Sequence, residues 1–130
     1  MKILSKMKPK RIIIIEDNPT GAYLLSEFFR LKGFTYIYFS TATDAIRFFD
    51  TPESDNYKAV LMDIKLPGMS GIEATKIIKT KKPNIHIFMQ SAYVSSTNKL
   101  KAFESGASKF FEKPLKLNEI LKSVEEVYNE

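Results

Sequence analysis

The sequence contains no cysteine and only one histidine, His86. The absence of cysteine excludes disulfides, thiolate metal sites and cysteine nucleophiles. A single histidine excludes metal sites built from several histidines, and it leaves His86 as the only possible base of a histidine-dependent triad. Because His86 falls near the start of a predicted strand, we expect it to pack there rather than to catalyse.

Long apolar runs are also missing. The longest, such as Ile12 to Ile15, have four residues, whereas a membrane-spanning helix needs about 20. The first eleven residues lack the apolar segment of a signal peptide, so we expect a cytoplasmic protein with no membrane insertion. The length of 130 residues suits one domain with one sizeable core.

The net charge of +5 is concentrated at the amino terminus. The first eleven residues contain five basic residues and no acidic one, and the rest of the chain contains 15 of each. We therefore divide the chain into a basic tail, residues 1–10, and a nearly neutral domain, residues 11–130. The domain shows no basic face or motif typical of nucleic-acid binding, so we expect no nucleic-acid partner. The tail can add weak, salt-sensitive attraction to anionic partners, although a solvated leader is the simpler interpretation.

Short apolar segments alternate five times with helical patterns along the domain. The four consecutive isoleucines of the first segment are typical of a strand that is covered on both faces of a parallel sheet. The first helix carries apolar residues at positions 24, 25, 28, 29 and 31, and we expect this stripe to face the sheet. Strands are predicted at 11–15, 35–39, 59–63, 85–90 and 109–112, helices at 19–32, 41–49, 71–81, 97–105 and 117–128, and a polar loop at 51–56. The pattern predicts an α/β fold in which five helices cover a doubly wound, five-stranded parallel sheet.

Polar side chains stand at the ends of four of the predicted strands. Glu16 and Asp17 follow the first strand, Asp63 ends the third, Ser91 follows the fourth and Lys113 follows the fifth. Because the carboxyl ends of parallel strands share one edge of such a sheet, we expect these side chains to meet in one cleft. Each residue alone has an ordinary explanation, as a helix cap, a loop residue or a solvated lysine, but those explanations would have to hold at all four strand ends together.

The residue types in this cluster suggest a particular chemistry. Three carboxylates in one cleft repel one another unless a positive group balances them. Mg²⁺, which prefers oxygen ligands, supplies such a charge, and Lys113 adds a second positive group. Carboxylates, a metal, a lysine and the Ser91 hydroxyl around one aspartate are the parts needed to transfer a phosphoryl group to Asp63.

Other functions of α/β domains fit the sequence less well. Dinucleotide-binding enzymes and P-loop NTPases need a glycine-rich turn after the first strand, and residues 16–19 contain no glycine. A phosphohydrolase with an aspartyl nucleophile usually has a second acid two residues later, where this sequence has Lys65.

Four segments of the sequence resemble the receiver domains of two-component response regulators. They are IIIIEDN at 12–18, VLMDIKLPGMSG at 60–71, MQSA at 89–92 and GASKFFEKP at 106–114, in a suitable order and spacing. The resemblance covers essentially the whole chain after the basic tail. It implies a flavodoxin-like fold and a regulatory rather than an enzymatic role, as a Mg²⁺-dependent switch phosphorylated by a histidine kinase or a histidine phosphotransfer protein.

The resemblance also implies roles for the acidic residues. Asp63 would be the phosphoacceptor. Glu16, Asp17 and Asp63 would hold the metal, and the backbone carbonyl of Lys65 would complete the protein ligands.

Further residues of the motifs would respond to phosphorylation. Ser91 and Lys113 would bind the phosphoryl oxygens, and the peptide bond between Lys113 and Pro114 would be cis. Phe110 would be the aromatic residue that turns inward when the switch closes, although it lacks the hydroxyl of the tyrosine that is also common at this position.

Two positions near the proposed acceptor carry a charged or a bulky side chain. Lys65 lies two residues after Asp63, and Tyr93 lies two residues after Ser91. We expect these two side chains to shield the acyl phosphate and to slow its hydrolysis.

The chain ends with the last predicted helix, so we expect a stand-alone receiver that acts by protein binding, self-association or phosphoryl relay. The expected output surface combines the fourth helix, fifth strand and fifth helix and carries Lys99, Lys101, Glu104, Lys109, Phe110 and Glu112. The kinase-facing surface is expected on the first helix near Pro19 and Tyr23, with the loop after Pro114. The alternative is a degenerate receiver that binds proteins without being phosphorylated.

Overall fold

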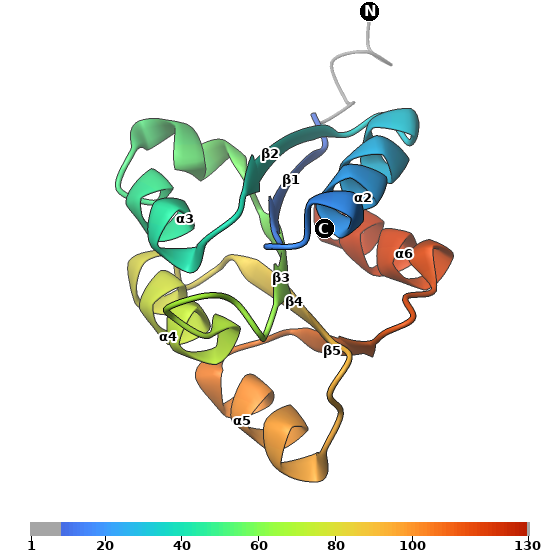
Figure 1. Ribbon diagram of the computed structural model, residues 1–130. Coiled ribbons are helices and arrows are strands. Elements are labelled where there is room, and N and C mark those ends of the chain that lie inside the picture. The colour runs from blue at the N-terminus through green and yellow to red at the C-terminus, as the bar shows by residue number, and fades with distance from the viewer. Residues whose placement is uncertain (1–8, 130) are drawn as a thin grey trace, which may run out of the picture.

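The computed structural model describes residues 9–129, with a parallel sheet between two layers of helices (Figure 1). The strand order is β2-β1-β3-β4-β5. The strands are β1 (Arg11–Ile15), β2 (Thr35–Phe39), β3 (Ala59–Asp63), β4 (His86–Ser91) and β5 (Lys109–Glu112). The helices are α2 (Pro19–Leu31), α3 (Ala42–Phe48), α4 (Gly71–Lys81), α5 (Ser96–Ser105) and α6 (Leu117–Tyr128), with a 3₁₀ helix η1 (Pro52–Asn56).

These elements confirm the predicted doubly wound α/β fold, with five parallel strands and five α-helices in the described residues. The predicted basic tail, residues 1–10, lies almost entirely outside the part of the chain that the structure describes. No helix within residues 9–129 is both long enough and apolar enough to cross a membrane.

The isoleucine run of β1 shows why the sheet needs helices on both faces. Ile12 and Ile14 pack under α2 and α6, whereas Ile13 and Ile15 pack on the opposite face under α3, α4 and α5 (Figure 1). All four side chains are fully buried. We call the first of these surfaces the α2/α6 face.

Two helices begin next to the carboxyl ends of the strands. The Asn18 side chain caps α2 by accepting a hydrogen bond of 2.8 Å from the N–H of Gly21, and Pro19 occupies the first helical turn. At the start of α4, a Cβ on Gly71 would lie 2.3 Å from the carbonyl oxygen of Asp63. Glycine is therefore required at position 71 for α4 to begin this close to the end of β3.

The prediction for the buried stripe of the first helix is partly wrong. Leu24 is 58% exposed and Leu31 is 70% exposed. The buried positions of α2 are Ala22, Leu25, Ser26 and Phe29, which follow the helical repeat. The small side chains of Ala22 and Ser26 let the helix lie close to the sheet, and this orientation turns Leu24 and Leu31 outward.

Several boundaries also differ from the predictions, including one end each of α2 and α5 by one residue. The fourth strand runs one residue later, His86–Ser91, because its pairing with β5 continues through Ser91, which is the partner of Glu112. The predicted polar loop at 51–56 contains the 3₁₀ helix η1. The helix predicted at 41–49 is α3, Ala42–Phe48, with Thr41 as its cap.

Candidate functional site

Three carboxylates converge at the carboxyl edge of the sheet. Glu16 and Asp17 follow β1, and Asp63 is the last residue of β3. Carboxylate oxygens of these three residues lie within 4.8 Å of one another. Glu16 and Asp63 are only 2% and 6% exposed, while Asp17 is exposed. The predicted meeting of the acidic strand ends is therefore present in the structure.

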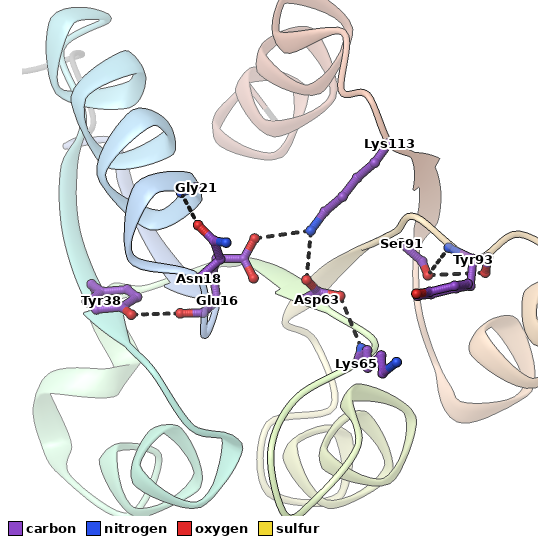
Figure 2. A network of polar contacts seen from close by, with 9 residues as sticks. All are labelled: Glu16, Asn18, Gly21, Tyr38, Asp63, Lys65, Ser91, Tyr93 and Lys113. Atoms are coloured by element: carbon purple, nitrogen blue, oxygen red, sulfur yellow. Dashed lines mark hydrogen bonds and ion pairs between the residues drawn. The ribbon is translucent and has the colours of Figure 1, made fainter.

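Lys113 provides the positive charge of the cluster. Its side chain extends from the end of β5 across the carboxyl edge, so that Nζ lies 2.8 Å from Oδ2 of Asp63 and 3.2 Å from Oε1 of Glu16 (Figure 2). The backbone N–H of Lys113 donates to the carbonyl of Ser91 over 2.9 Å, which fixes the end of β5 against β4. The peptide bond to Pro114 is cis, as predicted.

Burial and mutual repulsion change the proton affinities of this cluster. The pKa of Glu16 is raised from 4.5 to about 7, first because burial disfavours its charged form and then because Asp63 lies beside it, while Lys113 opposes the rise. Burial by itself would lower the pKa of Lys113, but hydrogen bonds and charge from Asp63 and Glu16 outweigh burial and raise it. The lysine is thus held in its charged form, and Glu16 readily takes up a proton.

Three further predicted residues border the same cleft: Ser91, Lys65 and Tyr93. The Ser91 hydroxyl donates to the carbonyl of Tyr93 over 3.1 Å and accepts from the N–H of Tyr93 over 3.0 Å. The backbone N–H of Lys65 donates to Oδ1 of Asp63 over 3.0 Å, and the Lys65 Nζ lies 4.8 Å from the centre of the Tyr93 ring. The cleft, of about 600 Å³, is lined by Glu16, Asp17, Asn18, Pro19, Asp63, Lys65, Leu66, Pro67, Ser91, Ala92, Tyr93 and Lys113.

Phe110 lies outside this cleft. It is half-buried in β5 and packs against the core under α3, α4 and α5. Lys99 of α5 places its Nζ 6.0 Å from the centre of the Phe110 ring. The structure therefore shows Phe110 between β5 and α5, with β4 separating it from β3, the strand that carries Asp63.

Gln90 is a polar residue near the site that the sequence analysis did not single out. It lies in β4, is fully buried, and has no hydrogen-bond partner for either Oε1 or Nε2 among the described residues. Its signal in the sequence was a lone amide after the apolar run of Ile87, Phe88 and Met89.

The donor set of the cluster suits a hard divalent cation. Glu16, Asp17 and Asp63 offer carboxylate oxygens, which Mg²⁺ prefers over nitrogen and sulfur. Oε2 of Glu16 is buried and has no hydrogen-bond partner within residues 9–129, so it is available for a metal or a metal-bound water. These residues therefore fit a metal of this kind.

Comparison with known proteins identifies the family. The family model of the response regulator receiver domain matches residues 12–125. The sporulation initiation phosphotransferase F of Bacillus subtilis (strain 168) is 30% identical over 118 residues, which span 91% of this chain and 93% of that protein. The chain therefore belongs to the response regulator receiver domain family, whose members are phosphorylation-dependent switches of two-component signalling. The predicted family and its general function are confirmed.

Solved structures agree with this assignment. The chain resembles a structure described as the CheX-CheY-BeF₃-Mg complex from Borrelia burgdorferi, with a TM-score of 0.86, 25% identity, and coverage of 96% of this chain and 93% of that one. A CheY-like receiver domain from Methanospirillum hungatei has the same fold, with a TM-score of 0.84 at 24% identity and coverage of 91% and 92%.

Some curated relatives are much longer than this chain. A cyclic di-GMP phosphodiesterase from Thermotoga maritima is 33% identical over 106 residues, which span 82% of this chain but only 27% of that protein. The match to hybrid signal transduction histidine kinase L of Dictyostelium discoideum spans 7% of that protein. The chain thus corresponds to one part of these larger proteins.

Proposed function

We propose that this receiver accepts a phosphoryl group on Asp63 and acts as a regulatory switch rather than as an enzyme with its own substrate. The observation that carries the proposal is the meeting of the Glu16, Asp17 and Asp63 carboxylates within 4.8 Å, with the Lys113 ammonium 2.8 Å from Asp63. A cluster that served only to stabilise the fold would need no more carboxylates than are required to pair with the lysine. This one gathers a buried excess of negative charge around one aspartate.

Mg²⁺ is the proposed cofactor of the site. Glu16, Asp17 and Asp63 would hold it, together with the backbone carbonyl of Lys65. When bound, the cation supplies positive charge opposite the carboxylates and the incoming phosphoryl oxygens. The buried, unpartnered oxygen of Glu16 supports this assignment.

The proposed reaction is a displacement at phosphorus. A carboxylate oxygen of Asp63 forms a bond to phosphorus while the P–N bond of a phosphohistidine breaks, and the histidine nitrogen leaves with the electron pair. Lys113 remains beside the new acyl phosphate and neutralises its oxygens. The donor is a histidine kinase or a histidine phosphotransfer protein, the partner class of the receiver family.

The phosphorylated state would differ from the free state in its contacts with Ser91. In the structure, the Ser91 hydroxyl is bonded to the backbone of Tyr93. A phosphoryl group on Asp63 offers it a charged acceptor, which would draw Ser91 and the start of the following loop toward the site. Inward movement of Phe110 into the space that this loop leaves would carry the change to α5 and β5.

Lys65 and Tyr93 form a cover over the mouth of the site. The distance of 4.8 Å between Nζ and the ring centre suits a cation–π contact. Because both side chains line the cleft that an attacking water must enter, we propose that they lengthen the lifetime of the acyl phosphate.

Two surfaces are proposed for partners. The first helix of the domain, α2, would face the phosphoryl donor together with the loop after Pro114. Its first residue, Pro19, lines the cleft, and Tyr23 near its start is exposed. The surface of α5, β5 and α6 would serve the output partner or self-association. Its proposed residues are Lys99, Lys101, Glu104, Lys109, Phe110 and Glu112.

Intact mass spectrometry tests the proposal. The protein is incubated with Mg²⁺ and phosphoramidate beside Asp63→Asn, with Asp50→Asn as a matched control at an exposed aspartate that pairs with Lys81. We expect one labile phosphoryl adduct on the wild type and on Asp50→Asn, and none on Asp63→Asn or after chelation. If neither phosphoramidate nor a phosphorylated histidine phosphotransfer protein yields an adduct, the degenerate, binding-only receiver is the correct description.

A further inference from the structure

Gln90 is a buried polar residue for which the proposed reaction provides no role. Its side chain is fully buried in β4, and neither of its polar atoms has a partner among the described residues. An unbonded amide in the core costs stability, whereas an apolar side chain of the same shape would not. The preceding strand residues Ile87, Phe88 and Met89 are apolar. The amide therefore calls for an explanation other than packing.

The strand register places Gln90 beside the proposed phosphoacceptor. Asp63 and Gln90 are Cα partners in the ladder between β3 and β4, and Ile15, the residue before Glu16, is paired with Met62. Partner side chains point to the same face of a sheet, so Glu16, Asp63 and Gln90 form a row across β1, β3 and β4. The row continues the α2/α6 face, on which Leu61 and Phe88 precede Asp63 and Gln90 by two residues.

The distances along this row suit a hydrogen bond from the amide. Neighbouring strands lie about 4.8 Å apart. A glutamine side chain is long enough to reach the carboxylate on the adjacent strand, and one buried water extends its reach to the strand beyond. Because Nε2 of Gln90 makes no direct hydrogen bond to Asp63 or Glu16 in the structure, one bridging water would complete its contact with this row.

The carboxylates of the row have few donors. Among the described residues, their hydrogen bonds come from Lys113 Nζ and from the backbone N–H of Lys65. Oε2 of Glu16 is buried without a donor, and Nε2 of Gln90 is buried without an acceptor. The residues that carry these two atoms lie on β1 and β4, the strands on either side of β3, and the two atoms are complementary as donor and acceptor.

We propose that Gln90 is a positioning residue of the phosphorylation site, whose Nε2 donates to the carboxylate row of Asp63 and Glu16 through one buried water. This inference rests on the proposed role of Asp63 as the acceptor. The donated hydrogen bond restrains the carboxylate from the side opposite β1 and keeps one oxygen directed at the incoming phosphorus. The amide is retained at a cost in stability because it increases the rate of phosphoryl transfer.

A measurement on the unphosphorylated protein tests the contact itself. The side-chain amide signals of Gln90 are assigned in the ¹H–¹⁵N spectrum of the full chain by correlation with its backbone, and are then followed in Asp63→Asn and Glu16→Gln. We expect these signals to shift in both variants and to stay unchanged in Ser105→Ala, a control that removes a buried hydroxyl bonded to the Ala102 carbonyl. Signals that remain unchanged in Asp63→Asn and Glu16→Gln would overturn the proposal.

Two variants of Gln90 test the consequence. Gln90→Met keeps the size of the side chain and removes the donor, and Gln90→Glu keeps its shape and replaces the donor with a carboxylate. We expect an unchanged or higher urea midpoint for Gln90→Met, together with at least a tenfold lower rate of phosphorylation by phosphoramidate at saturating Mg²⁺. Gln90→Glu is expected to be at least as slow.

A wild-type rate in either variant would overturn the role of Gln90. If the wild-type protein itself took up no phosphoryl group, the proposed function would fail instead. The amide signals would still decide whether Gln90 contacts the carboxylates, so the two failures are distinguishable.

Discussion

The buried carboxyl group of Glu16 makes a sharp prediction about stability without metal. Its pKa is raised from 4.5 to about 7, chiefly by burial and then by the neighbouring Asp63. The folded protein therefore binds this proton more tightly than the unfolded chain does. The stabilisation that the proton gives is fully present below pH 4.5 and is lost as the pH rises to about 7.

The size of the effect follows from the two pKa values. At about 1.4 kcal/mol per pH unit, the ionised Glu16 costs the folded state about 3 kcal/mol above pH 7, of which about 2 kcal/mol appears between pH 5 and pH 8. Glu16→Gln carries no titratable proton at this position. We expect the free energy of unfolding of Glu16→Gln minus that of the wild type to be about 2 kcal/mol larger at pH 8 than at pH 5, because the wild type loses stability over this range.

Urea unfolding in the presence of a chelator measures this difference. Glu104→Gln, at an exposed glutamate of α5, is the matched control, and its difference from the wild type should change little with pH. A Glu16→Gln variant whose difference from the wild type is the same at pH 5 and pH 8 would refute the reasoning. Added Mg²⁺ should raise the stability of the wild type relative to Glu16→Gln at pH 8, because the cation stabilises the wild-type carboxylate cluster.

Three further perturbations follow from the geometry. Lys113→Met leaves two buried carboxylates without their cation. We expect this variant to be destabilised by about 1–3 kcal/mol at pH 8 without metal. An unchanged urea midpoint would contradict this expectation. Lys65→Ala and Tyr93→Ala should each shorten the lifetime of the phosphorylated protein several-fold, as followed by loss of the mass adduct; an unchanged lifetime in the double variant would remove the shielding role. Gly71→Ala forces a Cβ to within 2.3 Å of the Asp63 carbonyl and should lower stability by more than about 2 kcal/mol, so a wild-type melting temperature would show that α4 shifts freely.

The fold was predictable because its three central strands, β1, β3 and β4, are buried on both faces. The isoleucine run 12–15 and the apolar segment 59–62 have no polar alternation, and such runs leave a covered parallel strand as the natural interpretation. The site was predictable for a related reason. A charged residue at the end of a strand in a parallel sheet lies at the carboxyl edge, which is where Asp63 and Lys113 meet.

The features that were missed depend on orientation and packing, which spacing alone does not fix. The sequence offers Leu24 and Leu31 as apolar residues of the first helix, but the small residues Ala22 and Ser26 determine which side approaches the sheet. Gln90 ends an apolar run and could be taken for the polar end of a strand. Only the register with Asp63 shows that its amide is buried in the same row.

Chemical trapping of the phosphorylated protein tests the central claim most directly. Borohydride reduces an aspartyl phosphate to homoserine, and peptide mapping by tandem mass spectrometry then identifies the modified position. After incubation with Mg²⁺ and phosphoramidate, we expect homoserine at position 63 and at no other aspartate. Homoserine at position 17 in place of position 63, or a stable phosphoryl adduct on a residue outside the cleft, would contradict it.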